Sequence, residues 1–140
     1  MYMLAVRDLL KRPAVSLPEM ATIREVAVEL AKNRVGLAVL TARDNPKKPV
    51  AVVSERDVLR AVAQRLDLDG PASSIANPPI TVLDTDPVRV AAEKMRRHNI
   101  RHVVVVDRNG DLVGVLSIRD LCFERAILIE LAAAEAPATP

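Results

Sequence analysis

The feature that most constrains this chain is an internal repeat that covers nearly all of its 140 residues. The segment Thr22–Ala27 matches Pro87–Ala92. Further along the chain, Ala51–Asp57 matches Gly114–Asp120. Matches that recur in the same order indicate a tandem duplication rather than chance similarity. The chain therefore contains two copies of one structural unit, the first with a slightly longer loop around Asn45.

Helix signals open each copy. In the first copy, Thr22 and Glu25 predict a capping box, in which each side chain caps the other residue's backbone N–H. In the second copy, Asp86 is expected as the N-cap and Pro87 as the first helical residue. Apolar residues then recur at i, i+3, i+4 and i+7, which predicts an amphipathic helix. They are Ile23, Val26, Ala27 and Leu30 in one copy, and Val88, Ala91, Ala92 and Met95 in the other.

Two strands rich in β-branched residues follow each of these helices. Asn109-Gly110 between the last two strands is typical of a hairpin turn. A short extended piece precedes each first helix, and a second helix is expected after Ser54 and after Ser117. The element order is therefore β-α-β-β-α, twice, in a mixed α/β fold. The hairpin strands are expected at 37–41, 50–53, 103–106 and 112–116.

The duplication divides the chain into two units that need each other. A repeat of about 60 residues buries too little apolar surface to be stable alone. Both strands of each hairpin are apolar on both faces, so both faces need cover. We therefore expect the repeats to pack together as a pseudo-two-fold pair. The expected ranges are 1–66 for the first repeat with its lead-in helix, 67–71 for a linker, 72–134 for the second repeat, and 135–140 for a frayed tail.

Composition excludes several classes of protein. Half of the residues are hydrophobic, which excludes a disordered chain. Cys122 is the only cysteine, which excludes an internal disulfide and a multi-cysteine metal site. Charged residues such as Arg7 and Lys11 interrupt the apolar runs, so neither a membrane span nor a signal peptide is expected. These features predict a cytoplasmic protein.

Neither catalysis nor nucleic-acid binding is well supported. The chain has 20 basic and 18 acidic residues, a net charge of +2, and the two signs are interspersed. Tyr2 and Phe123 are its only aromatic residues, whereas single-strand binding favours a basic stripe with aromatic faces. His98 and His102 are the only histidines, and no catalytic or zinc-binding motif accompanies them. We therefore expect no enzymatic activity and no metal.

The duplicated unit resembles the CBS domain, named after cystathionine β-synthase. The resemblance covers about residues 5–130 and rests on the repeated element order, the passage 99–107, and the motif Gly114–Asp120, in which glycine and two apolar residues precede Ser-x-x-Asp. It implies a pair of CBS repeats that bind adenosine-containing ligands, such as AMP, ADP, ATP or S-adenosylmethionine, in two clefts between the repeats.

The motif residues suit such a ligand. A carboxylate such as Asp57 can accept both hydroxyl hydrogens of a ribose diol. The N-terminus of the following helix attracts phosphate, and Arg56 adds forked N–H donors. The alternative is structural, because Ser54 and Asp57 also form the pattern of a helix cap. The second copy carries the same residue types at Ser117, Arg119 and Asp120.

The resemblance implies two unequal sites, each joining the motif of one repeat to the strand entrances of the other. Arg101 and His102 in site A, where site B has Gly36 and Leu37, favour phosphate binding at A. Ala51, where the family usually has glycine, favours site B if the ligand needs a bare backbone. Site A is expected to comprise Ser54, Arg56, Asp57, Pro79, Ile80, Ile100, Arg101 and His102. Site B is expected to comprise Pro13, Val15, Val35, Gly36, Leu37, Ser117, Arg119 and Asp120.

The sequence thus predicts a regulatory, energy-sensing module that binds an adenine nucleotide, with AMP favoured over ADP and ATP. We expect it to form a homodimer, a flat disc of four repeats, and to act on an unidentified protein partner. Two alternatives stay open: a nucleic-acid binder using Arg96–His98, and a ligand-independent interaction module using the helix expected at 118–134. The apolar residues of that helix are Leu121, Ile127, Leu128 and Leu131.

Overall fold

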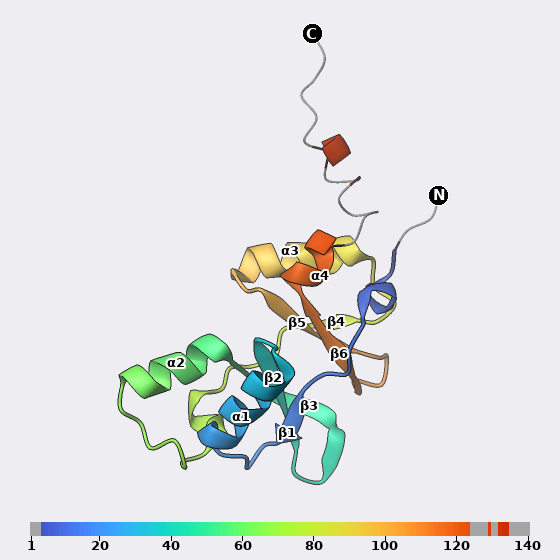
Figure 1. Ribbon diagram of the computed structural model, residues 1–140. Coiled ribbons are helices and arrows are strands. Elements are labelled where there is room, and N and C mark those ends of the chain that lie inside the picture. The colour runs from blue at the N-terminus through green and yellow to red at the C-terminus, as the bar shows by residue number, and fades with distance from the viewer. Residues whose placement is uncertain (1–3, 124–128, 130–131, 135–140) are drawn as a thin grey trace.

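The computed structural model describes residues 4–123, 129 and 132–134. Two similar halves, each with one sheet and its helices, lie one above the other (Figure 1). The first half contains η1 (Val6–Leu9), β1 (Ser16–Pro18), α1 (Ile23–Asn33), β2 (Leu37–Ala42), β3 (Asn45–Ser54) and α2 (Glu55–Ala63). The second contains η2 (Ala72–Ile75), β4 (Thr81–Leu83), α3 (Val88–His98), β5 (His102–Val106), β6 (Leu112–Ser117) and α4 (Ile118–Phe123). The repeated β-α-β-β-α order and the mixed α/β fold are confirmed.

Each half has the same sheet topology. The strand order is β1-β2-β3 in one sheet and β4-β5-β6 in the other, and the first pair is parallel and the second antiparallel in both. Leu37 faces Ser54 across the first hairpin, and His102 faces Ser117 across the second. The serine of each motif therefore ends its strand beside the start of the neighbouring strand, where the next helix begins.

The predicted helix start is correct for α1 in the first repeat but not for α3 in the second. Thr22 and Glu25 form the predicted capping box on α1. The expectation for α3 is wrong: Pro87 is the N-cap, and the helix begins at Val88. Pro87 has an extended backbone, and the Asp86 carboxylate accepts a hydrogen bond from the N–H of Leu83 at 2.9 Å, so it caps the preceding turn instead of the helix.

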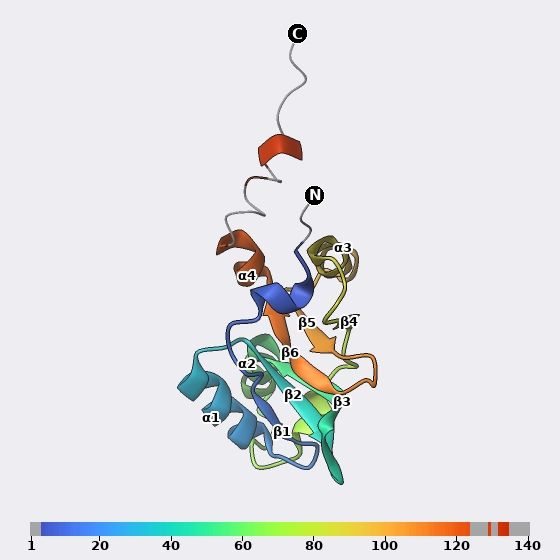
Figure 2. The ribbon, with the colours of Figure 1, turned by 90° about the vertical axis from the view of Figure 1, so that its right-hand side faces the viewer.

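The lead-in segments are exchanged between the halves. Val6 and Leu9 of η1 are fully buried in the core of the second repeat, beside Leu116. The N–H of Val6 donates to the carbonyl of Asp86 at 2.8 Å. Figure 2 shows η1 lying beside α3 and α4, away from the rest of the first repeat. In return, Ala72 of η2 is buried in the first core. Each core is therefore completed by the lead-in of the other repeat.

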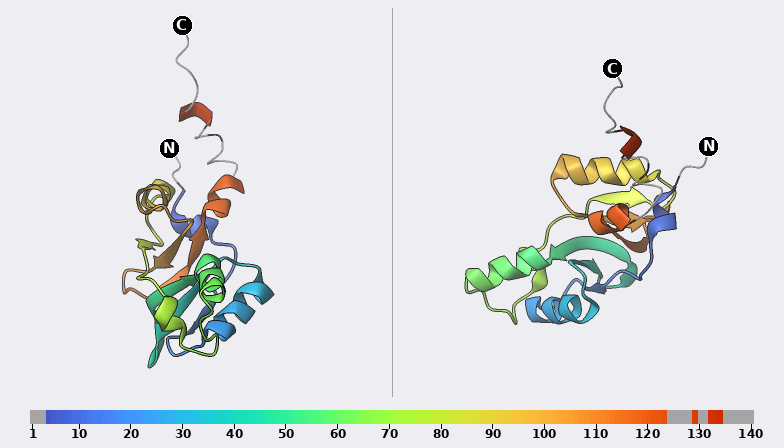
Figure 3. Two further views of the ribbon diagram at one scale, coloured as in Figure 1. Left: turned by 90° about the vertical axis from the view of Figure 1, so that its left-hand side faces the viewer. Right: turned by 45° about the horizontal axis from the view of Figure 1, so that its top comes forward.

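The two sheets meet in the middle of the molecule, as the two-sided apolar strands predict. Figure 3 shows α1 and α3 at opposite ends, with the sheets between them. Val39 and Val52 of the first sheet form one buried cluster with Val104 and Val106 of the second. This cluster gives the inner strands cover on their second face, and it holds the repeats together.

The final helix is only partly described. Leu121 of α4 is 8% exposed and packs in the second core, so it is not part of an exposed apolar stripe on this helix. Ile127, Leu128, Leu131 and the tail at 135–140 lie outside the described residues. Within the described ranges, no helix combines the length and apolar character that crossing a membrane requires.

Candidate ligand-binding clefts

A large cavity lies between the two repeats, and we call it cleft A. Its volume is about 1340 Å³. The first repeat contributes the end of β3 and the start of α2, and the second contributes residues from 77–80, α3, β5 and α4. All the residues expected in site A line this cavity except Pro79, which is replaced by its neighbour Pro78. They are Ser54, Arg56, Asp57, Ile80, Ile100, Arg101 and His102.

Asp57 is the most buried charged residue of cleft A, with 8% of its surface exposed. Its Oδ2 accepts hydrogen bonds from the N–H of Ser54 at 2.8 Å and from the Ser54 hydroxyl at 2.9 Å. Its Oδ1 lies 3.5 Å from the amide nitrogen of Asn77 and 3.6 Å from a guanidinium nitrogen of Arg60. The Asp57 carboxylate thus caps α2 with one oxygen, and its other oxygen makes only long contacts within the described part of the chain. That oxygen can accept a hydroxyl hydrogen from a ligand.

Cleft A combines this carboxylate with apolar and basic walls. Ile80 and Ile100 are half-buried and supply apolar surface from the second repeat. Arg56 and Arg101 are exposed residues that supply guanidinium groups from opposite repeats. The Arg56 side chain stands in the first turn of α2, where backbone N–H groups also attract anions. Such a cavity can hold a flat heterocycle, a diol and a phosphate together.

His102 of the second repeat lies against Gly36 of the first. A Cβ atom on Gly36 would lie only 3.0 Å from Cε1 of the His102 ring, so the absence of a side chain at Gly36 makes room for the imidazole. Burial lowers the pKa of His102 below its usual value of 6.5. The negative charges of Glu55 and Asp120 oppose this effect, and the positive charge of Arg101 reinforces it. The folded protein therefore favours the neutral imidazole.

This preference predicts a pH-dependent contribution to stability. Because the pKa of His102 is lower in the folded chain than in the unfolded chain, the unfolded chain binds more protons near pH 6. The stabilising contribution is complete above the unfolded pKa of 6.5 and is lost as the pH falls towards the folded pKa. Urea denaturation at pH 7.5, 6.5 and 5.5 should show wild type losing more stability than His102→Asn. Parallel losses in the two proteins would contradict the prediction.

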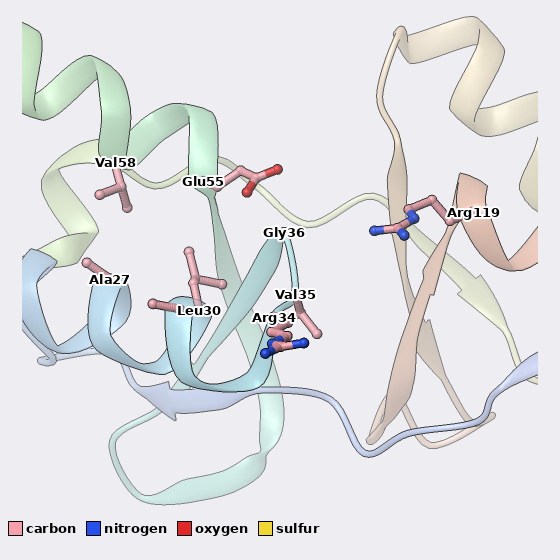
Figure 4. A pocket seen from close by; sticks show the side chains of 9 residues that line it. Ala27, Leu30, Arg34, Val35, Gly36, Glu55, Val58 and Arg119 are labelled. Atoms are coloured by element: carbon pink, nitrogen blue, oxygen red, sulfur yellow. The ribbon is translucent and has the colours of Figure 1, made fainter.

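A second cavity of about 400 Å³, cleft B, lies between α1 and the start of α2. Arg119 reaches it from the second repeat, opposite Gly36 and Glu55 (Figure 4). Of the residues expected in site B, Val35, Gly36 and Arg119 line this cavity. Leu37 lines cleft A instead. The remaining four, Pro13, Val15, Ser117 and Asp120, do not line either cavity.

The repeat relates the two clefts. Each residue that lines cleft B has its repeat counterpart in the lining of cleft A: Ala31 corresponds to Arg96, Gly36 to Arg101, and Arg119 to Arg56. The clefts are therefore pseudo-symmetric, and cleft A extends further. Sequence reasoning missed Arg96, Asn77 and Glu55 as lining residues.

The motif glycine has a packing role in this structure. A Cβ atom on Gly114 would lie 3.1 Å from a methyl carbon of Leu10, in the lead-in segment that docks on the second repeat. The bare backbone at Gly114 therefore accommodates Leu10. Protein fills the space beside Gly114, so the bare backbone there gives site B no closer approach to a ligand than Ala51 gives site A.

Comparison with protein-family models finds the CBS domain at residues 6–64 and again at 72–126. The chain belongs to the CBS domain family. The two matched ranges coincide with the two halves of the fold, so the chain carries a CBS domain pair. Within the described residues, no group of three or more histidine, cysteine, aspartate or glutamate side chains could hold a metal ion.

Known proteins similar to this CBS pair include one with a bound nucleotide. A CBS domain protein from Pyrobaculum aerophilum complexed with AMP is 85% identical, with a TM-score of 0.90, and the match covers 93% of this chain and 99% of that one. A CBS domain pair in complex with 5′-methylthioadenosine and S-adenosyl-L-methionine is 27% identical, with a TM-score of 0.76, over 85% of this chain and 97% of that one.

An uncharacterized 17.7 kDa protein from Acidianus ambivalens is 32% identical over 108 residues, which are 76% of this chain. The match spans 63% of that protein's length. A further uncharacterized protein, from Methanopyrus kandleri, is 26% identical, over 86% of this chain and 62% of its own length. The chain therefore spans less than two thirds of the length of these curated relatives.

Proposed function

We propose that this CBS domain pair is a regulatory module that binds an adenine nucleotide, AMP foremost, in cleft A. The observation that carries the proposal is the convergence of Asp57, Arg56 and Arg101 with apolar residues of the opposite repeat on one cavity. The AMP complex of the similar Pyrobaculum aerophilum protein supports the same ligand class.

The geometry of cleft A suggests how the nucleotide is held. The ribose diol donates to the Asp57 carboxylate. The phosphate lies near the start of α2, where Arg56 and Arg101 donate charge-assisted hydrogen bonds. The adenine packs between Ile80 and Ile100, since the lining of cleft A contains no Phe, Tyr or Trp. Each half of the molecule thus contributes to binding, and a bound nucleotide favours one relative arrangement of the repeats.

Regulation would follow because the repeats are arranged differently with and without the nucleotide. A partner protein that prefers the nucleotide-bound arrangement experiences a coupling free energy, typically about 1–3 kcal/mol. We propose the same role for cleft B, where Arg119 reaches the cavity from the second repeat. We further propose a homodimer, which is supported by the exposed apolar residues Leu59 and Val62 on α2, 69% and 52% exposed.

Calorimetric titration with AMP, ADP, ATP and S-adenosylmethionine tests the proposed function. We expect saturable binding of AMP, and a nucleotide at 100 times its Kd should stabilise the fold by about 2.7 kcal/mol. If none of the four ligands binds, the Ser-x-x-Asp pairs are only helix caps. The exposed face of α2 would then favour an interaction module that needs no ligand.

A further inference from the structure

We propose that cleft A contains an additional anion subsite, formed by Arg96 and His98 of α3, which binds the phosphates beyond the first in a nucleoside di- or triphosphate. This inference rests on the proposed function, because it assumes that the nucleotide lies in cleft A. The subsite would make cleft A selective among adenine nucleotides, because Arg96 and His98 contact the additional phosphates of ADP and ATP and not the first phosphate.

The charge of cleft A exceeds what a single phosphate needs. Arg56 lines the cavity from the first repeat and Arg101 from the second, and Arg96 of α3 adds a third guanidinium from the second repeat. The carboxylates in the lining are Glu55 and Asp57, and Asp57 is already engaged in capping α2. An adenosine triphosphate carries more negative charge than a monophosphate, and Arg side chains bind phosphate oxygens in pairs.

Arg96 is placed differently from its neighbour Arg97. The Arg97 guanidinium pairs with Glu93 at 3.3 Å, one turn earlier on α3, and it does not line the cavity. Arg96 lines cleft A, and no carboxylate of the described residues lies within ion-pairing distance of it. A basic residue near a helix C-terminus is favourable for the helix dipole in either position. That general effect explains why α3 ends in basic residues, but not why Arg96 lines the cleft without an ion-pair partner among the described residues.

The pseudo-symmetric cleft provides an internal comparison. The counterpart of Arg96 in cleft B is Ala31, and the counterpart of Arg101 is Gly36. Cleft B is also much smaller, at about 400 Å³ against 1340 Å³. Typical small-molecule pockets are about 300–1,000 Å³, so cleft A has room for more than a nucleoside monophosphate. The extra volume and the extra basic groups occur in the same cleft, which points to a longer polyanionic ligand there.

The test compares AMP and ATP binding to wild type, Arg96→Ala and Arg97→Ala by calorimetry. Arg96→Ala gives cleft A the residue that cleft B has, and Arg96 is exposed, so folding should be unaffected. We expect this variant to lose about tenfold in ATP affinity, with AMP affinity changed less than twofold. Arg97→Ala removes the same charge from the same helix and should change neither affinity by more than twofold. His98→Ala should weaken ATP binding selectively, as Arg96→Ala does.

Three results would overturn the subsite. They are an equal loss of AMP and ATP affinity in Arg96→Ala, an equal loss of ATP affinity in Arg96→Ala and Arg97→Ala, and AMP binding without ATP binding in wild type. The failure of the proposed function has a different signature, because wild type would then bind neither nucleotide. Tripolyphosphate, which lacks the nucleoside, should compete with ATP in wild type and compete less well in Arg96→Ala.

Discussion

Replacing Asp57 with alanine is expected to abolish nucleotide binding at cleft A while the chain still folds. Asp57 is the buried carboxylate in the lining of the cavity, and its loss removes the proposed acceptor for the ribose hydroxyls. A hydrogen bond to a charged group contributes about 1.5–3 kcal/mol, so the loss of two predicts a decrease in affinity of at least about a hundredfold. Calorimetric titration with AMP measures it.

The substitution has a second effect that needs its own control. Asp57 caps α2 together with Ser54, so Asp57→Ala should also cost about 1 kcal/mol of stability. Glu25 makes the equivalent capping box with Thr22 on α1 and lines neither cavity. Glu25→Ala should therefore show a similar loss of stability with unchanged AMP affinity. Equal AMP affinity in wild type and Asp57→Ala would show that Asp57 is only a helix cap.

Replacing Leu9 with alanine is expected to destabilise the chain by about 2–5 kcal/mol. Leu9 is 1% exposed and lies in the core of the second repeat with Val82 and Leu116. Its truncation leaves a cavity in that core, although Leu9 belongs to the first repeat in the sequence. Because each lead-in completes the opposite core, unfolding by urea should remain a single cooperative transition.

The matched control is Leu66→Ala, which truncates the same side-chain type at a position that is 40% exposed. Its expected cost is about 0.5 kcal/mol or less. If Leu9→Ala were as mild as this control, η1 would not be docked in the second core. If the variant unfolded in two separate transitions, the exchange of lead-in segments would not couple the repeats.

The repeat and its elements could be predicted because local signals are strong there. The spacing of Ile23, Val26 and Leu30 gives α1, and all three residues are buried. Thr22 and Glu25 give its start. Asp86 misleads because a capping side chain can turn towards the preceding loop when Pro87 intervenes. Such a choice depends on loop geometry, which residue types alone do not determine.

The exchange of lead-in segments could not be predicted from pattern. Periodicity shows that Val6 and Leu9 are apolar and need burial, but it does not show which core receives them. The same limit applies to Leu121, which periodicity assigns to an apolar face and the structure places in the second core.

The site residues divide in a similar way. Nearly all the residues that the resemblance to CBS repeats predicts for site A line cleft A, because the duplication relates the motif of one repeat to the strand entrances of the other. The prediction for site B is less accurate, because Pro13 and Val15 do not line cleft B. Val15 packs against the first core instead. Arg96 required the structure, because only the cavity shows that it faces the ligand side of α3 while Arg97 does not.

The most direct test of the proposed function is a crystal structure of the protein grown with AMP. We predict electron density for AMP in cleft A, with the ribose hydroxyls on the Asp57 carboxylate, the adenine between Ile80 and Ile100, and the phosphate near Arg56 and Arg101. AMP bound outside the clefts, or a cleft A that stays empty at saturating AMP, would contradict it.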